Sequence, residues 1–277
     1  MGGYDTPMPK TLYLIDGHAQ IYRAYYAPFG SLSSPTGEPT RATHVFCQML
    51  LNLLRDRQPD YLALTMDVSD ETVFRRDIDP DYKAHREPPP EDLPIQTERI
   101  VQIINAMRIP LLRVPHFEAD DVMATLVHRH AGEDLSVYLV SKDKDLEQLL
   151  SPHVALYDPG KDEVITPKEL VATKGWTPEL AVEAQILTGD PVDNVSGVKG
   201  IGPKTAAKLL EKYGSVKEII AHADELTPKQ CENVLAFEPR VDITRQLVTL
   251  RDDVPIEFEL ADAERGRFDY AAAHEIF

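Results

Sequence analysis

Short apolar runs alternate with longer segments of helical periodicity through the N-terminal part of the chain. The apolar runs cover residues 11–15, 61–66, 109–114, 135–140 and 154–157. Apolar residues recur every three or four positions in 40–54, 95–107 and 121–131, and a short helix is expected at 146–150. Continuous apolar runs that stop at Asp, Gly or Pro are typical of buried parallel strands. The order of elements therefore predicts an α/β layer with a mostly parallel central sheet.

The segment 70–94 breaks this pattern, because it has no continuous apolar face. Its basic and aromatic residues are Arg75, Arg76, Tyr82, Lys83, His85 and Arg86, and three prolines follow at 88–90. We expect a mobile, partly helical excursion outside the core. By position alone, an ordinary solvated surface loop is the simpler interpretation.

From Pro167 onward the periodicity is helical and no strand is expected, which predicts a second, helical lobe. A helix is expected at 178–187 and another at 206–213, with the glycine-rich run Gly197–Gly202 between them. The run nearly matches a phosphate-binding P-loop, but Pro203 stands where a lysine should follow Gly202, and no strand precedes it. We therefore expect a hairpin between two helices, with Pro203 at a first helical position.

Such a hairpin can bind DNA without reading its sequence. Glycines allow close approach of the backbone, and backbone N–H groups can donate to a phosphate. Lys199, Lys204 and Lys208 add positive charge on that side. The alternative is an ordinary glycine-rich connection between two helices.

Composition limits the possible partners. Asp and Glu (46 residues) outnumber Lys and Arg (29), which gives a formal net charge of −17. This balance argues against a protein that simply coats nucleic acid, although it leaves local basic patches open. No apolar run approaches the roughly 18 to 20 residues of a membrane span. Cys47 and Cys231 lie in no metal-like or redox spacing, so we expect reduced thiols and a cytoplasmic protein.

Acidic residues gather where predicted strands end. Asp16, Asp67, Asp143 and Asp145 each follow a predicted strand, and the carboxyl ends of parallel strands form the ligand-binding edge of an open α/β sheet. Glu118, Asp120 and Asp121 precede or begin a predicted helix that would lie along the same edge. Single acids at helix starts and strand ends are ordinary caps and turn formers. Several together require a cation, and oxygen ligands alone favour Mg²⁺ or Mn²⁺ over zinc.

These features resemble the 5′-nuclease family, the flap endonucleases and 5′→3′ exonucleases that include the N-terminal domain of bacterial DNA polymerase I. The resemblance spans nearly the whole chain and depends on the order of several motifs. These are Ile15-Asp16-Gly17, Asp67, Phe74-Arg75, Tyr82-Lys83-Ala84-His85-Arg86, Glu118-Ala119-Asp120-Asp121, Asp143-Lys144-Asp145, Gly189-Asp190, Asp193-Asn194 and Gly197-Val198-Lys199-Gly200-Ile201-Gly202.

The resemblance implies a PIN-like α/β fold and a role for each motif. The implied metal ligands are Asp16, Asp67, Glu118, Asp120, Asp121, Asp143, Asp145, Asp190 and Asp193. Residues 70–94 match the family's arch over the active site, with Lys83 and Arg86 facing the scissile phosphate and Arg23 as a basic residue beside the site. The implied DNA contacts are Arg75, Tyr82, Gly197, Val198, Lys199, Gly200, Ile201, Gly202, Lys204, Thr205 and Lys208, with K⁺ at the helix-hairpin-helix loop. Pro191-Val192 departs from the small polar residues usual there.

The resulting hypothesis is a metal-dependent 5′-nuclease that uses two or more Mg²⁺ or Mn²⁺ ions on DNA with 5′ flaps, nicks or free 5′ ends. We expect a catalytic domain at 10–175 and a helical, DNA-binding lobe at 176–277. We also expect a monomer without membrane contact, cut from a longer polymerase I, because 272–277 resembles the interior of a helix. The alternatives are a stand-alone exonuclease, a PIN-like ribonuclease and a non-catalytic module that binds branched DNA.

Overall fold

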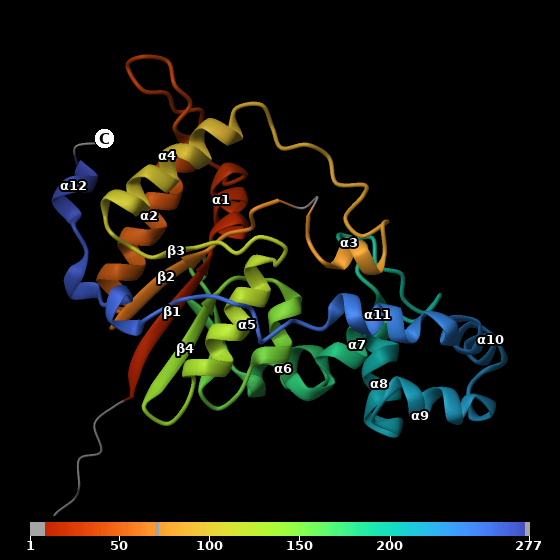
Figure 1. Cartoon of the computed structure of the whole chain (residues 1–277). Coiled ribbons are helices and arrows are strands. Elements are labelled where there is room, and N and C mark those ends of the chain that lie inside the picture. The colour runs from red at the N-terminus through yellow and green to blue at the C-terminus, as the bar shows by residue number, and fades with distance from the viewer. Residues whose placement is uncertain (1–8, 70–71, 275–277) are drawn as a thin grey trace, which may run out of the picture.

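The computed structural model describes residues 9–69 and 72–274, and Figure 1 shows a sheet-containing part joined to a helical lobe. The sheet has six strands in the order β3-β2-β1-β4-β5-β6. They are β1 (Lys10–Asp16), β2 (Tyr61–Thr65), β3 (Leu111–Leu112), β4 (Leu135–Val140), β5 (Val154–Asp158) and β6 (Glu163–Ile165). All neighbours pair in parallel except β5 and β6. The predicted, mostly parallel sheet is confirmed. The three-residue strand β6 was not predicted, because it is too short to show a period.

Both faces of the sheet are covered, which explains the continuous apolar runs. Leu12 and Leu14 of β1 belong to one buried cluster, and Tyr13 and Ile15 belong to the other. The second cluster includes helices α1 (Gly17–Tyr25), α2 (Arg41–Asp56) and α4 (Leu93–Ala106), which pack together above the sheet in Figure 1. Helix α5 (Ala119–His130) covers the opposite face. Alternate side chains of one strand therefore enter two different cores.

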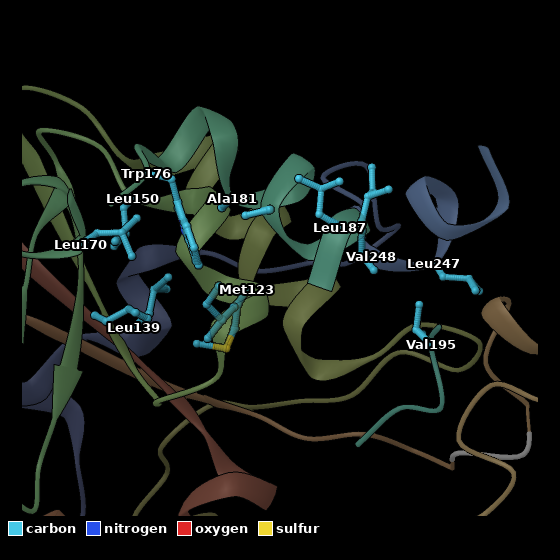
Figure 2. Close-up of a cluster of buried hydrophobic side chains, with 14 of the residues drawn as sticks. Met123, Leu139, Leu150, Leu170, Trp176, Ala181, Leu187, Val195, Leu247 and Val248 are labelled. Atoms are coloured by element: carbon cyan, nitrogen blue, oxygen red, sulfur yellow. The ribbon is translucent and has the colours of Figure 1, made fainter. Parts of the chain in front are cut away.

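The helical lobe shares one apolar core with α5. The helices after the sheet are α6 (Pro167–Lys174), α7 (Ala181–Thr188), α8 (Pro203–Tyr213), α9 (Val216–Ala221), α10 (Pro228–Phe237) and α11 (Val241–Val248). The single-turn or 3₁₀ segments are η1 (Lys144–Leu149), η2 (Pro178–Leu180), η3 (Ala223–Glu225), η4 (Glu238–Arg240), η5 (Leu260–Ala263) and η6 (Arg265–Arg267). Figure 2 shows Met123 of α5 in the same cluster as Trp176, Leu187 and Val248. Pro203 is the first residue of α8, as predicted.

The expectation that residues 70–94 lie outside the core is wrong for a few buried side chains of this segment, whereas residues 84–89 are exposed. Val73 and Tyr82 are each 3% exposed and belong to the core that α5 shares with the helical lobe. The segment contains one helical turn, α3 (Arg75–Ile78), and Arg75 is 1% exposed. Periodicity missed this burial because the segment packs through a few separate side chains. Residues 70 and 71 lie outside the described part of the chain.

After α11 the chain returns across the sheet-containing part as an extended segment, which we name the C-terminal strap (residues 249–269; Figure 1). The Val254 amide donates to Thr125 Oγ1 at 3.0 Å, and the Asp269 amide donates to the Met107 carbonyl at 2.9 Å. The strap ends at α12 (Tyr270–His274), which contacts α4. The last three positions of the helix expected at 272–277 lie outside the described residues. No helix of residues 9–69 and 72–274 is both long and apolar enough to cross a membrane.

Candidate active site at the carboxyl edge of the sheet

The strand ends bring one group of acids together. Asp16 ends β1, where its Oδ1 accepts from the Ala19 amide at 3.0 Å and caps α1. Asp67 follows β2 and accepts from the Ala119 amide at 2.6 Å, which ties it to the start of α5. Asp120 lies in the first turn of α5, and Asp143 follows β4. We name Asp16, Asp67, Asp120 and Asp143 the sheet-edge acids.

The sheet-edge acids repel one another strongly. Burial raises the pKa of Asp16 to about 6, and the carboxylates of Asp67 and Asp143 add to the shift. Burial also raises the pKa of Asp120 well above its ordinary value, and the other three sheet-edge acids and Asp145 contribute. A bound cation would relieve this cost, because opposite charge favours the ionised carboxylates.

Asp67 is the exception within this group. Burial alone would raise its pKa, but the neighbouring His18 and Lys83 side chains and the Ala119 amide lower the pKa to about 2. His18 was not singled out from the sequence. Its Nδ1 lies 3.4 Å from Asp67 Oδ2.

A second group of acids combines Asp145, from η1 after β4, with two acids of the helical lobe. Asp145, Asp190 and Asp193 each offer a carboxylate oxygen, and these oxygens all lie within 4.8 Å of one another. Burial raises the pKa of Asp145 well above its ordinary value, followed by the charges of Asp143, Asp193 and Asp190. Three converging carboxylates suit a hard divalent cation with oxygen ligands. We name these three residues the lobe acids.

The loop that carries Asp190 and Asp193 is held by close backbone contact. A Cβ atom on Gly197 would lie 2.3 Å from the Gly189 nitrogen, and a Cβ on Gly189 would lie 2.4 Å from the Gly197 nitrogen. Both positions therefore require glycine. The unusual Pro191-Val192 pair does not turn the acids away, because the Val192 amide donates to Asp190 Oδ1 at 2.9 Å and its side chain is exposed.

Two basic side chains of the arch (residues 70–94) contact acids of the site. Lys83 is 8% exposed, donates through Nζ to Glu118 Oε1, and lies 3.7 Å from Asp193 Oδ2. Its backbone has a φ of 54°, and its amide donates to the Asp193 carbonyl at 3.0 Å. Arg86 Nη2 lies 2.6 Å from Asp193 Oδ1. Lys144, which sequence reasoning missed as a site cation, lies 3.4 Å from Asp190 Oδ1.

Glu118 and Asp121 do not join either group of acids. Both pair with the buried Arg75 guanidinium, at 2.6 Å and 2.7 Å. The structure also does not support the expected DNA contacts of Arg75 and Tyr82, because both side chains are buried. The Tyr82 hydroxyl lies 3.0 Å from Glu118 Oε2 and 3.1 Å from Asp193 Oδ2, so its single proton is shared between two carboxylates.

Arg23 lies at the far side of the same edge. It pairs with Asp158, the last residue of β5, at 2.7 Å, and Lys142 approaches the same carboxylate at 2.6 Å. Burial would raise the pKa of Asp158, but hydrogen bonds from Lys142 and Arg23 keep it below the ordinary value. Lys142 and Asp158 also follow predicted strands, so the strand-end rule could have identified them.

The glycine-rich hairpin presents its backbone to solvent. Val198 and Ile201 are buried and anchor the loop, whereas Lys199, Gly200, Gly202, Lys204 and Lys208 are exposed and Thr205 is half-buried. Gly200 has a φ of 78°, a conformation that other residues adopt with strain. The side chains of Val198 and Ile201 are therefore unavailable to DNA.

Comparison with known proteins decides what the chain is related to. The model of the 5′-3′ exonuclease N-terminal resolvase-like domain matches residues 11–175, and that of the 5′-3′ exonuclease C-terminal SAM fold matches residues 176–271. The chain belongs to the 5′-3′ exonuclease family. It is thus a nuclease of the class that hydrolyses DNA phosphodiester bonds.

Relatives of this 5′-3′ exonuclease include longer proteins. It is 40% identical over 257 residues to DNA polymerase I of Rhizobium leguminosarum, covering 90% of this chain and 25% of that protein. It is 37% identical over 260 residues to the 5′-3′ exonuclease of Aquifex aeolicus, covering 94% of this chain and 88% of that protein. The chain therefore spans about a quarter of the length of the polymerase relative.

Solved structures share its fold at low identity. The T5 D15 protein co-crystallised with metal ions has a TM-score of 0.69 and 20% identity, covering 86% of this chain and 89% of that chain. The catalytic core of Rad2 in complex with DNA substrate has a TM-score of 0.58 and 12% identity, covering 92% and 84%. The predicted PIN-like α/β fold with a helical lobe is confirmed.

Proposed function

We propose that this 5′-3′ exonuclease is a structure-selective 5′-nuclease that uses two or more Mg²⁺ or Mn²⁺ ions. Its substrates are DNA molecules with 5′ flaps, nicks or free 5′ ends. The observation that carries the proposal is the meeting of two acid groups at one sheet edge. The sheet-edge acids and the lobe acids adjoin through Asp143 and Asp145, which are two residues apart and share a hydrogen bond between the Asp145 amide and Asp143 Oδ1 at 2.9 Å.

The residues present fit such a pair of ions. The sheet-edge acids would hold one ion and the lobe acids another, since both groups offer oxygen ligands. Burial makes their uncompensated negative charge unfavourable, and a bound cation would compensate it. Divalent ions bound there supply Lewis-acid chemistry for in-line phosphodiester hydrolysis. No side-chain nucleophile is then needed.

The chain's own cations complete the chemistry. Lys83 and Arg86 lie beside the lobe acids and would stabilise the negative charge that develops on the scissile phosphate. Burial opposes the charged form of Lys83, yet Glu118 and Asp193 together raise its pKa, so the ammonium stays protonated at neutral pH. Arg23 would bind a phosphate farther along the edge.

The helical lobe would hold the duplex. The exposed hairpin backbone and the side chains of Lys199, Lys204 and Lys208 suit phosphate contacts without sequence preference, with K⁺ bound at the loop. A covalently linked polymerase domain and a monomeric, cytoplasmic protein are further parts of the proposal. The polymerase relatives support the first of these.

The deciding experiment offers four substrates to the purified protein. A 5′-flap duplex, a nicked duplex, a duplex with a free 5′ end and single-stranded RNA are incubated with Mg²⁺ or with EDTA. We expect Mg²⁺-dependent cutting of the three DNA substrates. Preferential cutting of RNA would favour a PIN-like ribonuclease, and tight flap binding without cutting would favour a non-catalytic DNA-binding module.

A further inference from the structure

The Arg75 guanidinium uses all of its hydrogen-bonding capacity inside the protein. Nε donates to the Leu247 carbonyl at 2.7 Å, and Nη1 donates to Glu118 Oε2 at 2.6 Å and Asp121 Oδ2 at 2.7 Å. Nη2 donates to Asp121 Oδ1 at 2.8 Å and to the Thr249 carbonyl at 3.2 Å. An arginine has five N–H donors, and five bonds are made. Arg75 is therefore a complete buried junction rather than a surface cation.

Asp121 is equally saturated. Besides Arg75, its Oδ2 accepts from the Glu118 amide at 3.1 Å and its Oδ1 accepts from the Arg251 amide at 2.9 Å. The two oxygens thus accept four hydrogen bonds, which matches the roughly four lone-pair sites of a carboxylate. Asp121 is also 0% exposed. This carboxylate has no free lone pair to offer a divalent ion.

Glu118 links Arg75 to two other residues of the arch, Tyr82 and Lys83. Its Oε2 accepts from Arg75 and Tyr82, and its Oε1 accepts from Lys83. The Glu118 carboxylate therefore connects the fixed guanidinium, bound at Oε2, to Lys83, bound at Oε1. Lys83 and the Tyr82 hydroxyl both also approach a lobe acid, Asp193, and Lys83 is the one of the two that brings a positive charge there.

We propose that Arg75 is a positioning residue that holds Glu118 and Asp121 and, through Glu118, places Lys83 for the reaction. Glu118 and Asp121 then serve as ligands of this cation and not of a divalent metal. The inference rests on the proposed function of Lys83 at the scissile phosphate.

The junction explains why an arginine is needed at this position. Three segments meet there: the base of the arch, the start of α5, and the chain at the end of α11 and the start of the C-terminal strap. A planar fork can bind Asp121 with two nitrogens while Nε and the remaining N–H groups reach two carbonyls. A lysine has three donors on one atom and cannot span these partners.

The first test is a double-mutant cycle on the cleavage rate under single-turnover conditions. Arg75→Met is made in the wild-type protein and in Lys83→Ala. If Arg75 acts through Lys83, Arg75→Met should slow cleavage at least about tenfold in the wild-type background and by less than about threefold in Lys83→Ala. A wild-type rate for Arg75→Met, or equal losses in both backgrounds, would overturn the proposal.

Arg129→Met is the matched control. Arg129 also fastens the strap to α5, through the carbonyls of Ile256 at 2.7 Å and Val254 at 2.9 Å, but touches none of the acids. This variant should melt at a lower temperature and still cut at close to the wild-type rate. If Arg75→Met does not fold, Arg75→Lys takes its place in the same cycle, because it keeps the charge and loses the fork.

A second readout does not depend on cleavage. The rate of amine acetylation at Lys83, followed by peptide mass spectrometry in EDTA, reports whether this buried ammonium is held. We expect Lys83 to react several-fold faster in Arg75→Met and at an unchanged rate in Arg129→Met. An unchanged rate in Arg75→Met would overturn the proposal. A wild-type protein that cuts no DNA would instead refute the proposed function, and the labelling result would still decide the role of Arg75.

Discussion

Arg86 Nη2 lies 2.6 Å from Asp193 Oδ1, so a cation expected at the scissile phosphate is paired with an acid expected at a metal ion. Lys83 approaches the other oxygen of the same carboxylate at 3.7 Å. Without metal, these two side chains partly neutralise the lobe acids. A divalent ion must therefore compete with the arch for Asp193.

Arg86→Ala should separate the two proposed roles of Arg86, which are competition with the metal ion for Asp193 and stabilisation of the scissile phosphate. Because a competing cation is lost, we expect the affinity of the lobe acids for Mn²⁺ to rise several-fold, measured by calorimetric titration without DNA. Cleavage should slow by about 100-fold, the typical effect of removing one donor from a developing charge. Arg99→Ala is the control, since Arg99 forms a similar pair with Glu38 away from the acids. Unchanged Mn²⁺ affinity in Arg86→Ala would contradict the competition.

The two kinds of acid should behave differently in metal titrations. Asp145→Asn should weaken Mn²⁺ binding at least about tenfold, because it removes one of three converging carboxylates. Asp121→Asn should leave Mn²⁺ affinity within about twofold and lower the melting temperature, because the buried Arg75 guanidinium loses one of its two charged partners. Loss of Mn²⁺ affinity in Asp121→Asn would show that Asp121 is a metal ligand after all.

The stability of the metal-free protein should rise as the pH falls from 7.5 to 5.5. The pKa of Asp16 is raised to about 6 in the folded state, against about 3.9 when unfolded, so the folded state binds the proton more tightly. The penalty is complete above about pH 7 and shrinks as the pH falls through 6 toward 4, by roughly 3 kcal/mol in total, of which about 1 kcal/mol falls between pH 7.5 and 5.5. Asp67, with its pKa of about 2, titrates below this range.

Thermal melts in EDTA at the two pH values measure this effect. Each kcal/mol corresponds to roughly 2–4 °C for a chain near this size. Saturating Mg²⁺ should reduce the difference in melting temperature between pH 5.5 and pH 7.5, since bound metal takes the place of the protons. Asp143→Asn should also reduce it in EDTA, because Asp143 is one of the charges that raise the pKa of Asp16. A melting temperature in EDTA that is lower at pH 5.5 would contradict the crowded-acid interpretation.

Gly197→Ala should damage the metal site without changing any charge. The new Cβ would lie 2.3 Å from the Gly189 nitrogen, so the loop with Asp190 and Asp193 must shift. We expect weaker Mn²⁺ binding and a lower melting temperature. Gly202→Ala is the matched control from the same glycine-rich run, because its Cβ meets nothing within 4 Å. Equal effects of the two substitutions would show that the close contact is unimportant.

Lys204→Ala tests the hairpin as a phosphate-binding surface. The exposed Lys204 touches neither group of acids, so the substitution should weaken duplex binding and leave Mn²⁺ affinity unchanged. The slope of log affinity against log salt concentration should fall by about one unit if one phosphate contact is lost. An unchanged salt slope would remove Lys204 from the DNA contacts.

Sequence reasoning predicted the sheet well because its strands are buried on both faces and form continuous apolar runs. Helix α1 was not predicted, since Ile21 and Ala24 are its few buried apolar positions. A local signal was present, because Asp16 caps this helix three residues ahead of Ala19. That signal is weaker than periodicity and was interpreted as a strand end.

The strand-end rule also identified Asp16, Asp67 and Asp143, because it follows from sheet geometry alone. The roles of Glu118 and Asp121 could not be predicted in this way. Their partner Arg75 lies more than 40 positions earlier in the chain, and only the folded structure brings the three together. From the family motif alone, a metal ligand and a ligand of a buried arginine look the same.

Because of the C-terminal strap, segments that are far apart in the sequence should unfold together. The Arg265 amide donates to the Asp60 carbonyl at 3.0 Å, and the Asp269 amide donates to the Met107 carbonyl at 2.9 Å, so the last segment is bonded to some of the first. Removal of residues 176–277 would leave Asp60 and Met107 without these partners and Thr125 without the Val254 amide. The two parts that the family models match, residues 11–175 and 176–271, are therefore bonded to each other at both ends. Local unfolding of either part is opposed by its hydrogen bonds to the other.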